Sequence, residues 1–369
     1  MKRYLEDQVR EDVARKMVFV GGPRQVGKTT LAKSIIKDKE AYFNWDIPSQ
    51  REKILKRHFP ARPKAFIFDE IHKYRSWRNY LKGLYDELHA THEFIVTGSA
   101  RLDYYRFGGD SLQGRYHYLR LHPVSFAEIQ GGKGDLKDLL HYGGFPEPFL
   151  GGSEVQSRRW SIDYRSRLIR EDIVGVEAIH DLGNLELLLM RLPDLVGSPL
   201  SINALREDLQ LNHKTVSRWL DVLERLYGIF RLSPFGAPKI KAVKKEQKHY
   251  HFDWTLVTDK GCRFENMVAS HLLKWVNFLQ DTQGREVELR YFRDVYLREV
   301  DFVLMERREP IMFIEVKLSD SEINPGLKYL KERFPKAQAW QISFAGKKDY
   351  LTPDNIRVCP AGIFLRELV

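Results

Sequence analysis

A glycine-rich segment near the start of the chain has the residue types that bind phosphate. Residues 22–29 read Gly-Pro-Arg-Gln-Val-Gly-Lys-Thr, which is the pattern of Gly, four residues, Gly, Lys and then Ser or Thr. The glycines let the backbone curl so that successive N–H groups point at one phosphate. The segment predicts a nucleotide site in which Lys28 reaches the β- and γ-phosphates, formed by Gly22, Pro23, Arg24, Gln25, Val26, Gly27, Lys28, Thr29 and Thr30.

Acidic and hydroxyl side chains follow two later apolar runs. Asp69 and Glu70 come directly after residues 65–68, and residues 93–99 end in Thr97 and Ser99. We expect the Thr29 hydroxyl and Asp69 to hold Mg²⁺, and Glu70 to orient and deprotonate the attacking water. Ser99 or Thr97 is a candidate sensor of the γ-phosphate, although such residues also occur where a strand simply leaves a sheet.

A second set of chemically suited residues lies in the C-terminal third. Asp301 lies within the apolar strand predicted for residues 299–305, and Glu315 and Lys317 lie two apart on the next strand, so both face the same side. Asp301 and Glu315 could together hold Mg²⁺, with Glu265 supplying another oxygen and Lys317 stabilising a charged transition state. The order α-β-β-β-α-β resembles the restriction-endonuclease-like fold. Catalysis of phosphodiester cleavage and a fold kept only for binding both remain open.

Basic residues in the middle of the chain suggest a nucleic-acid surface. Two helical segments, residues 200–209 and 214–226, precede two short strands, which is a winged-helix pattern. The side chains expected to contact DNA phosphates are Lys214, Arg218, Lys244 and Lys245, and Lys248 lies among the same basic residues. The alternative is a module that packs between the ATPase and the C-terminal part.

The elements that must position these side chains divide the chain into four parts. Residues 1–130 alternate short apolar strands with helices, which predicts a parallel sheet covered on both faces. We expect a helical lid at 131–190, the winged helix at 191–252 and an α/β domain at 253–369. The predicted fold class is therefore α/β: a P-loop ATPase core with helical lid, winged helix and C-terminal restriction-endonuclease-like domain.

Composition limits the classes of protein to which the chain can belong. The chain has 369 residues and a net charge of +10, and its positive excess lies in residues 1–130 and 191–252. This balance favours polyanionic partners such as double-stranded DNA. We found no apolar run of the roughly 20 residues that span a bilayer and no signal peptide. With only Cys262 and Cys359, no disulfide framework is expected, and a cytoplasmic location with no membrane partner fits best.

Several of these motifs together resemble one family, the prokaryotic AAA-type ATPases with a C-terminal domain of unknown function. The motifs are residues 22–30, 68–72, 97–99, Gly114-Arg115 and 121–128, and Gly144-Phe-Pro146 is similar to the Gly-x-Pro motif of related signal-transduction ATPases. The resemblance implies that Arg115 acts as an arginine finger in a homo-oligomer or as a sensor within its own chain. A structural salt bridge at Arg115 is the alternative.

We therefore expect an ATPase that uses ATP and Mg²⁺ and acts on, or is regulated by, DNA, with a candidate Mg²⁺-dependent nuclease lobe. A regulatory module that binds protein partners without cleaving anything is the alternative. ATP turnover that responds to DNA would favour the first hypothesis over the second.

Overall fold

The computed structural model describes the chain apart from residues 61–63, 99–101, 103–111, 130–133, 174–180 and 237–245. The chain forms two compact units, the first comprising Met1–Val124 with Arg225–Tyr227 and the second Ser125–Glu224 with Gly228–Val369. Within the described residues, no helix is both long and apolar enough to cross a membrane.

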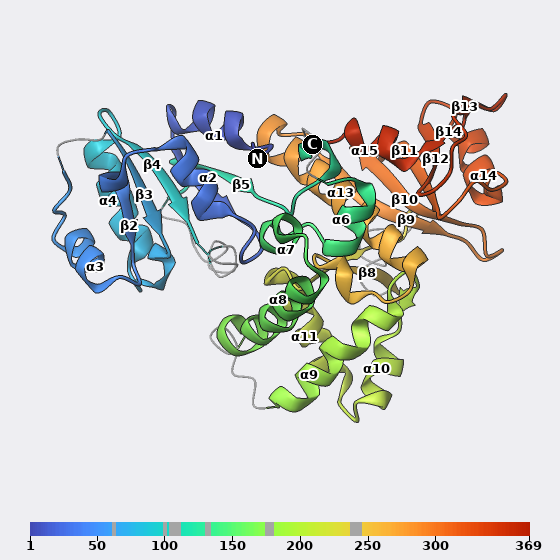
Figure 1. Cartoon of the computed structure of the whole chain (residues 1–369), viewed down its shortest axis with the longest axis horizontal. Helices are drawn as coiled ribbons and strands as arrows, with labels where there is room; N and C mark the ends of the chain where they lie inside the picture. Colours follow the sequence, from blue (N-terminus) through green and yellow to red (C-terminus); the bar gives the residue numbers. More distant parts are fainter. Residues whose placement is uncertain (61–63, 99–101, 103–111, 130–133, 174–180, 237–245) are drawn as a thin grey trace. The chain divides into compact units, whose positions relative to one another are not determined.

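Five parallel strands form the sheet of the first unit, in the order β2-β3-β4-β1-β5 (Figure 1). Parallel strands end at the same edge of their sheet, so the segments that follow β1, β3 and β4 meet there. These segments carry the P-loop (Gly22–Thr29) and the predicted polar side chains. The strands are β1 Met17–Gly21, β2 Tyr42–Asn44, β3 Ala65–Asp69, β4 Glu93–Thr97 and β5 Tyr116–Arg120.

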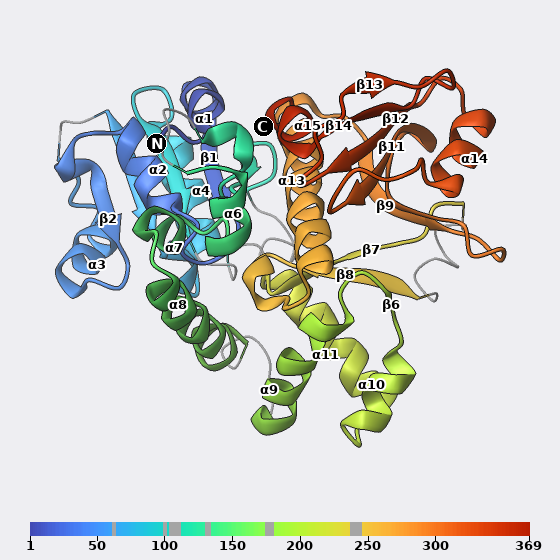
Figure 2. The ribbon, with the colours of Figure 1, turned by 45° about the vertical axis from the view of Figure 1, so that its right-hand side comes forward.

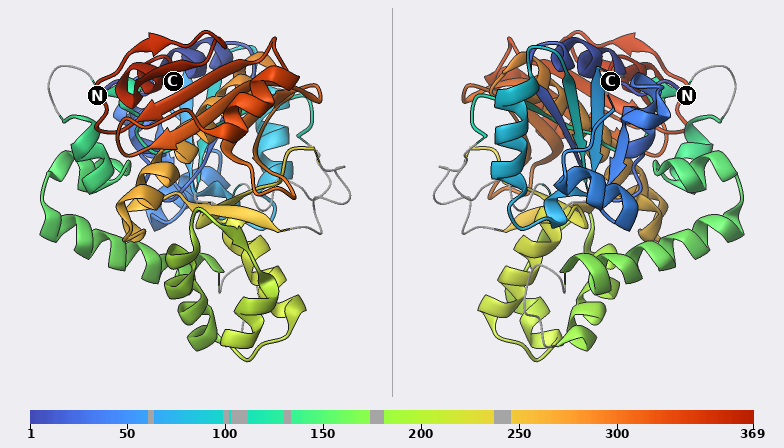
Figure 3. Two further views of the ribbon diagram at one scale, coloured as in Figure 1. Left: turned by 90° about the vertical axis from the view of Figure 1, so that its right-hand side faces the viewer. Right: turned by 90° about the vertical axis from the view of Figure 1, so that its left-hand side faces the viewer.

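Helices cover both faces of this sheet (Figure 3, right). On one face α1 contacts β1 and β4, and α2 contacts β3 and β4. On the other, the apolar side chains Trp77, Leu81 and Leu84 of α4 pack into an aromatic core that includes Phe19, Phe68 and Phe94. The helices are α1 Glu6–Val13, α2 Lys28–Ile35, α3 Pro48–Leu55 and α4 Trp77–Leu88, with short turns η1 Lys39–Ala41 and η2 Ile71–Lys73.

The second unit begins with helices, as predicted for residues 131–190. Phe145, Trp160 and Tyr164 stack on one another and form the core of this helical part. The elements are η3 Phe126–Glu128, α6 Leu136–Tyr142, α7 Pro146–Gly151, α8 Glu154–Arg167, the π-helical turn η4 Leu168–Ile173, α9 Leu182–Arg191 and η5 Leu192–Leu195.

Two helices and a small antiparallel sheet of order β6-β8-β7 follow. The apolar residues Val216, Leu220, Leu223 and Leu226 recur at helical spacing and are all buried. The helix predicted from residue 200 begins instead at Ile202, because Leu200 pairs with β8 in the sheet. The elements are β6 Pro199–Leu200, α10 Ile202–Asp208, α11 His213–Arg225, β7 Ile229–Leu232 and β8 Gln247–His251.

The C-terminal part contains a six-stranded sheet of order β13-β14-β12-β11-β10-β9 with α13 packed against it (Figure 2). The predicted order α-β-β-β-α-β is present, and β9–β10–β11 are antiparallel whereas β11–β12 are parallel. The elements are η6 Trp254–Leu256, α13 Lys260–Gln283, β9 Val287–Arg293, β10 Glu299–Glu306, β11 Glu309–Lys317, α14 Pro325–Arg333, β12 Gln338–Ser343, β13 Tyr350–Leu351, β14 Arg357–Pro360 and α15 Ala361–Arg366.

Candidate functional site

The P-loop has the backbone conformation that its sequence requires. Gly22, Gln25 and Gly27 have positive φ angles of 124°, 60° and 97°, a region that side chains disfavour. A Cβ atom on Gly22 would also lie 2.2 Å from the carbonyl oxygen of Leu121. Glycine is therefore the residue that fits at position 22, for both reasons.

Lys28 is the first residue of α2 and lies inside the curl of the loop. Its side chain is 7% exposed, and its Nζ donates to the carbonyl oxygens of Gly22 at 2.8 Å and Pro23 at 2.5 Å. These bonds hold the ammonium where a phosphate bound by the loop would meet it. The amino end of α2 adds the positive end of the helix dipole, which also favours an anion.

Asp69 receives three hydroxyl groups at the end of β3. Thr29 Oγ1 and Tyr42 Oη donate to its Oδ2 at 3.0 and 2.7 Å, and Thr97 Oγ1 donates to its Oδ1 at 2.7 Å. Burial and the Asp69 carboxylate together raise the pKa of Tyr42, so its hydroxyl stays a donor. The donor set of a threonine hydroxyl beside a carboxylate fits Mg²⁺, which prefers oxygen ligands.

Glu70 follows Asp69 with a positive φ of 57°, which turns its side chain out of the strand. Its Oε2 lies 3.1 Å from Nζ of Lys73, which also pairs with Asp46 at 2.5 Å. Burial raises the pKa of Glu70 against the opposing effect of Lys73. A carboxylate with a raised pKa is better suited to accept a proton, which agrees with the role expected for Glu70.

The structure brings some of the predicted residues together at this edge and places others elsewhere. Thr97 is buried and binds Asp69, so its position between the P-loop strand and Asp69 fits a role in orienting that carboxylate. Ser99 lies outside the described residues. Tyr42 and Lys73 were not predicted. Tyr42 reaches Asp69 only because β2 flanks β3, whereas Lys73 lies three residues after Glu70, a local spacing that could have indicated the pair.

Arg115 lies at the opposite edge of the sheet from the P-loop, where the parallel strands begin. It directly precedes β5, which runs parallel to β1, and its carbonyl oxygen accepts from the N–H of Met17 at the start of β1. The five-residue length of β1, roughly 16 Å, separates it from the P-loop edge. Its guanidinium binds both carboxylate oxygens of Asp86, at 2.7 and 3.2 Å. This geometry agrees with the salt-bridge alternative and not with a sensor within the same chain.

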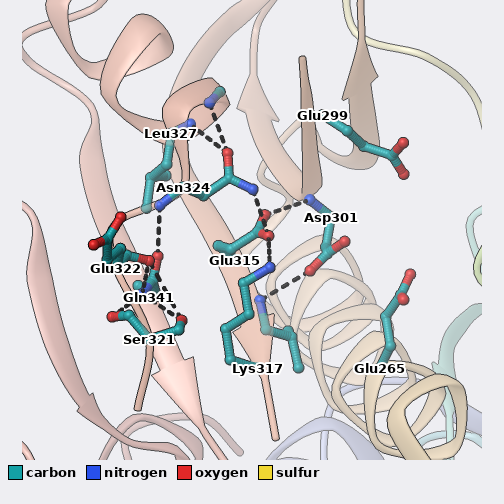
Figure 4. Close-up of polar contacts among 12 residues, drawn as sticks. Glu265, Glu299, Asp301, Glu315, Lys317, Ser321, Glu322, Asn324, Leu327 and Gln341 are labelled. Atoms are coloured by element: carbon teal, nitrogen blue, oxygen red, sulfur yellow. Dashed lines mark hydrogen bonds and ion pairs between the residues drawn. The ribbon is translucent and has the colours of Figure 1, made fainter. Parts of the chain in front are cut away.

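The C-terminal residues converge in the second unit (Figure 4). The backbone N–H of Val316 donates to Asp301 Oδ2 at 2.9 Å, and Lys317 Nζ donates to Glu315 Oε1 at 2.6 Å. Asn324 Nδ2 donates to the same Glu315 oxygen at 2.6 Å, while its Oδ1 caps α14 by accepting from two backbone N–H groups. Glu315 is thereby fixed by groups from β11 and from the start of α14.

Glu265 of α13 and Glu299 of β10 complete what we call the carboxylate cluster, together with Asp301 and Glu315 (Figure 4). Tyr250 Oη donates to Glu265 Oε1 at 2.7 Å. Burial and the charge of Asp301 raise the pKa of Glu265 to about 7 and that of Glu315 to about 8. Burial also raises the pKa of Asp301.

Lys248 of β8 is a second cation of this cluster, beside Lys317, which binds Glu315. The side chain of Lys248 is 1% exposed, and its Nζ lies 2.5 Å from Glu299, 3.4 Å from Glu265 and 4.0 Å from Asp301. Burial opposes its charge, but the carboxylates outweigh burial and raise the pKa of Lys248. The suggestion that Lys248 contacts phosphates with the basic loop is therefore wrong, because its side chain points into the protein.

The fit of Mg²⁺ to the carboxylate cluster is limited by this lysine. Carboxylate oxygens from Asp301 and Glu315 are suitable ligands for a hard cation. However, the described residues contain no group of three His, Cys, Asp or Glu side chains arranged to hold a metal. A metal bound at the cluster would have to share Asp301 with the ammonium of Lys248.

The predicted DNA-binding residues are partly described. Lys214 and Arg218 are exposed and lie four residues apart on α11, so they share one side of the helix. Lys244 and Lys245 lie outside the described residues.

Three protein-family models match successive parts of the chain. Residues 14–130 match an AAA domain, residues 133–259 a domain of unknown function (DUF8612) and residues 260–364 another domain of unknown function (DUF4143). No curated protein matches the sequence.

Among solved structures, the chain is similar to a Signal Transduction ATPase with Numerous Domains protein with a tetratricopeptide repeat sensor from Pyrococcus horikoshii. The sequence identity is 14% and the TM-score 0.25, with 76% of this chain and 47% of that chain covered. The chain thus spans about half the length of that protein. So low a TM-score does not establish a shared arrangement of domains, and the AAA match rests on the family model.

Proposed function

Because residues 14–130 match an AAA domain and carry a P-loop, we propose that the protein binds ATP with Mg²⁺ and hydrolyses it. The observation that supports this most directly is the meeting of Lys28, Thr29, Asp69 and Glu70 at one edge of the sheet. Mg²⁺, when bound, would neutralise charge on the phosphates, and Thr29 and Asp69 would hold it. The loop N–H groups and Lys28 would bind the phosphate oxygens.

Glu70 would act on the attacking water. For this its carboxylate must be available to accept a hydrogen bond from water, and in the structure the ammonium of Lys73 occupies it. We expect the attacking water, once it is bound beside the γ-phosphate, to compete with Lys73 for a hydrogen bond to Glu70. The test is steady-state ATP turnover by the full chain. No turnover by a protein that binds ATP would reduce the proposal to nucleotide binding alone.

We further propose that the nucleotide state controls an action on DNA. The supporting observation is the exposed pair Lys214 and Arg218 on α11, the second helix of a helix–turn–helix followed by the β7–β8 hairpin, which resembles a winged helix. A gel-shift assay tests this with Lys214 and Arg218 both changed to Ala. The matched control changes exposed Lys347 and Lys348 to Ala. DNA binding that both double variants retain equally would contradict the proposal.

Cleavage of DNA by the carboxylate cluster is a separate proposal. It is supported by the convergence of Asp301, Glu315 and Lys317 on adjacent strands, as in a restriction-endonuclease-like fold. Nicking that requires Mg²⁺ and is lost in Asp301→Ala, with ATP turnover intact, would support it. The alternative is a regulatory module that binds protein partners without cleavage. The position of Lys248 among the acids favours that alternative, and the absence of nicking on any DNA tested would agree with it.

A further inference from the structure

The segment before α1 carries a buried arginine that contacts the P-loop. Arg3 is 7% exposed, and its Nη1 donates to the carbonyl oxygen of Val26 at 2.7 Å. Its Nη2 donates to the carbonyl oxygen of His122 at 2.5 Å. One guanidinium thus joins two segments that lie 23 and 119 residues away along the chain. Hydrogen bonds from a charged donor are stronger than those between neutral groups, so both carbonyls are held firmly.

The contact with Val26 has a direct consequence for phosphate binding. A trans peptide unit is planar, and its C=O and the following N–H point in opposite directions. Because Arg3 binds the carbonyl of Val26, the N–H of Gly27 points to the side of the peptide away from Arg3. Gly27 has a positive φ of 97° and directly precedes α2, where a P-loop offers N–H groups to an anion. Arg3 therefore fixes the orientation of one expected phosphate donor from outside the loop.

Through its contact with His122, Arg3 connects the P-loop to the segment that ends the first stretch of the first unit, Met1–Val124. Tyr4 Oη donates to the carbonyl of Arg120 at 2.5 Å and accepts from the N–H of His122 at 3.2 Å. Leu121 N donates to the carbonyl of Gly21 at 2.9 Å, next to the close approach at Gly22. Residues 120–122 therefore contact the start of the P-loop directly, and they reach its far end at Val26 only through Arg3. They lead within two residues to Val124, where the first stretch of the first unit ends.

We propose that Arg3 is a positioning residue of the nucleotide site that couples the P-loop to residues 120–122. The inference rests on the nucleotide binding proposed above. Bound phosphate fixes the Gly27 N–H, and through the same peptide it strengthens the Val26–Arg3–His122 connection. Nucleotide binding then stiffens the segment by which the chain leaves the ATPase unit.

The first test compares Arg3→Gln with Arg3→Lys and with the matched control Arg10→Gln. Arg10 is an exposed arginine of α1 that pairs with Glu6, so its loss removes the same charge without touching the P-loop. We expect Arg3→Gln to weaken binding of ATP, ADP and inorganic pyrophosphate about tenfold and to raise KM for ATP similarly, with kcat nearly unchanged. The Lys side chain of Arg3→Lys can donate to one carbonyl at a time, so its nucleotide affinity and KM should lie between those of Arg3→Gln and the wild type. Arg10→Gln should have the affinity and KM of the wild type.

The second test measures amide hydrogen exchange of residues 119–124 with and without saturating ADP. In the wild type and Arg10→Gln, ADP should slow exchange in this segment, and in the Arg3 variants the slowing should be reduced. Wild-type affinity in Arg3→Gln, or undiminished protection of residues 120–122, would overturn the proposal. If Arg3→Gln does not fold, Arg3→Lys decides the question by the same measurements. A wild-type chain that binds no nucleotide would overturn the proposed ATPase function and this inference together.

Discussion

Lys28 of the first unit and Lys248 of the second are both buried lysines, but they have different partners. Lys28 binds two backbone carbonyls, and the nearby Asp69 is held by three neutral hydroxyls. Lys248 lies among Glu265, Glu299 and Asp301 and balances their charge directly. The partners named here for Lys28 and Asp69 are therefore neutral groups, whereas those of Lys248 are carboxylates. If the proposed function holds, the same residue types serve nucleotide binding in the first unit and cohesion of the fold in the second.

The largest effect is expected for Lys28→Ala. It removes the ammonium that meets the β- and γ-phosphates, so ATP binding should weaken by more than about 100-fold. The carboxylate cluster provides the contrasting variant, because Lys317→Ala should leave ATP binding unchanged. Titration with a fluorescent ATP analogue measures both. Equal losses in the two variants would mean that Lys28 has no specific role in ATP binding.

Glu70→Gln should separate binding from chemistry. The amide keeps the size of the side chain and leaves Thr29 and Asp69 in place, so ATP should still bind. Turnover should fall by about 10²–10⁴-fold, the usual contribution of general acid–base catalysis. Single-turnover hydrolysis measured beside ATP affinity checks this. Hydrolysis at the wild-type rate would remove Glu70 from the proposed role.

Lys248→Met should act on stability and leave ATP binding unaffected. It keeps the length of the side chain but leaves three carboxylates of the cluster without their buried cation. Removing one partner of a buried ion pair costs about 3–5 kcal/mol, and we expect that loss in the free energy of unfolding of the second unit. Urea denaturation measures it. A variant as stable as the wild type would show that protonation of Glu265 and Glu315 relieves the charge without the lysine.

The smallest expected effect is on how far the free energy of unfolding falls at acidic pH. His249 and His251 are fully buried on β8, and burial lowers their pKa to about 4 and about 3. The unfolded chain binds protons at these residues below about pH 6.5, so they make the folded state less stable as the pH falls from 6.5 toward 4. His249→Gln can still donate to Leu192 and should reduce this loss by roughly 3 kcal/mol at pH 4. Denaturation at pH 7 and pH 4, compared between variant and wild type, isolates the contribution, since the carboxyl groups are common to both. An unchanged difference between the two pH values would argue against buried neutral histidine here.

The P-loop site could largely be predicted because most of it is contiguous. Residues 22–29 specify the loop, and the apolar run before Asp69 and Glu70 specifies their strand. The partners of Asp69 could not be predicted in the same way. Tyr42 and Thr97 reach it only because β2 and β4 flank β3, and the order of strands is a property of the whole sheet.

The carboxylate cluster shows more clearly what cannot be predicted from the sequence. The alternation of β11 correctly predicted that Glu315 and Lys317 share a side. Nothing in the sequence near Lys248 shows that its side chain meets three acids, since these come from α13 and β10. A lysine in a basic run is most simply predicted to have a solvent-exposed side chain. Only the packing of β8 against α13 shows that the side chain of Lys248 is buried.

The two sides of β8 also bear on how this protein can be divided. Lys248 and Tyr250 point into the carboxylate cluster, whereas His249 binds Leu192 and the following Asp253 accepts from Ser161 of the helical part. The family models meet between residues 259 and 260, after this strand. A fragment that begins at residue 260 would contain Glu265, Glu299 and Asp301 but not Lys248. The boundary between the two family matches is therefore not a boundary of folding in this chain, because each part supplies side chains to the interior of the other.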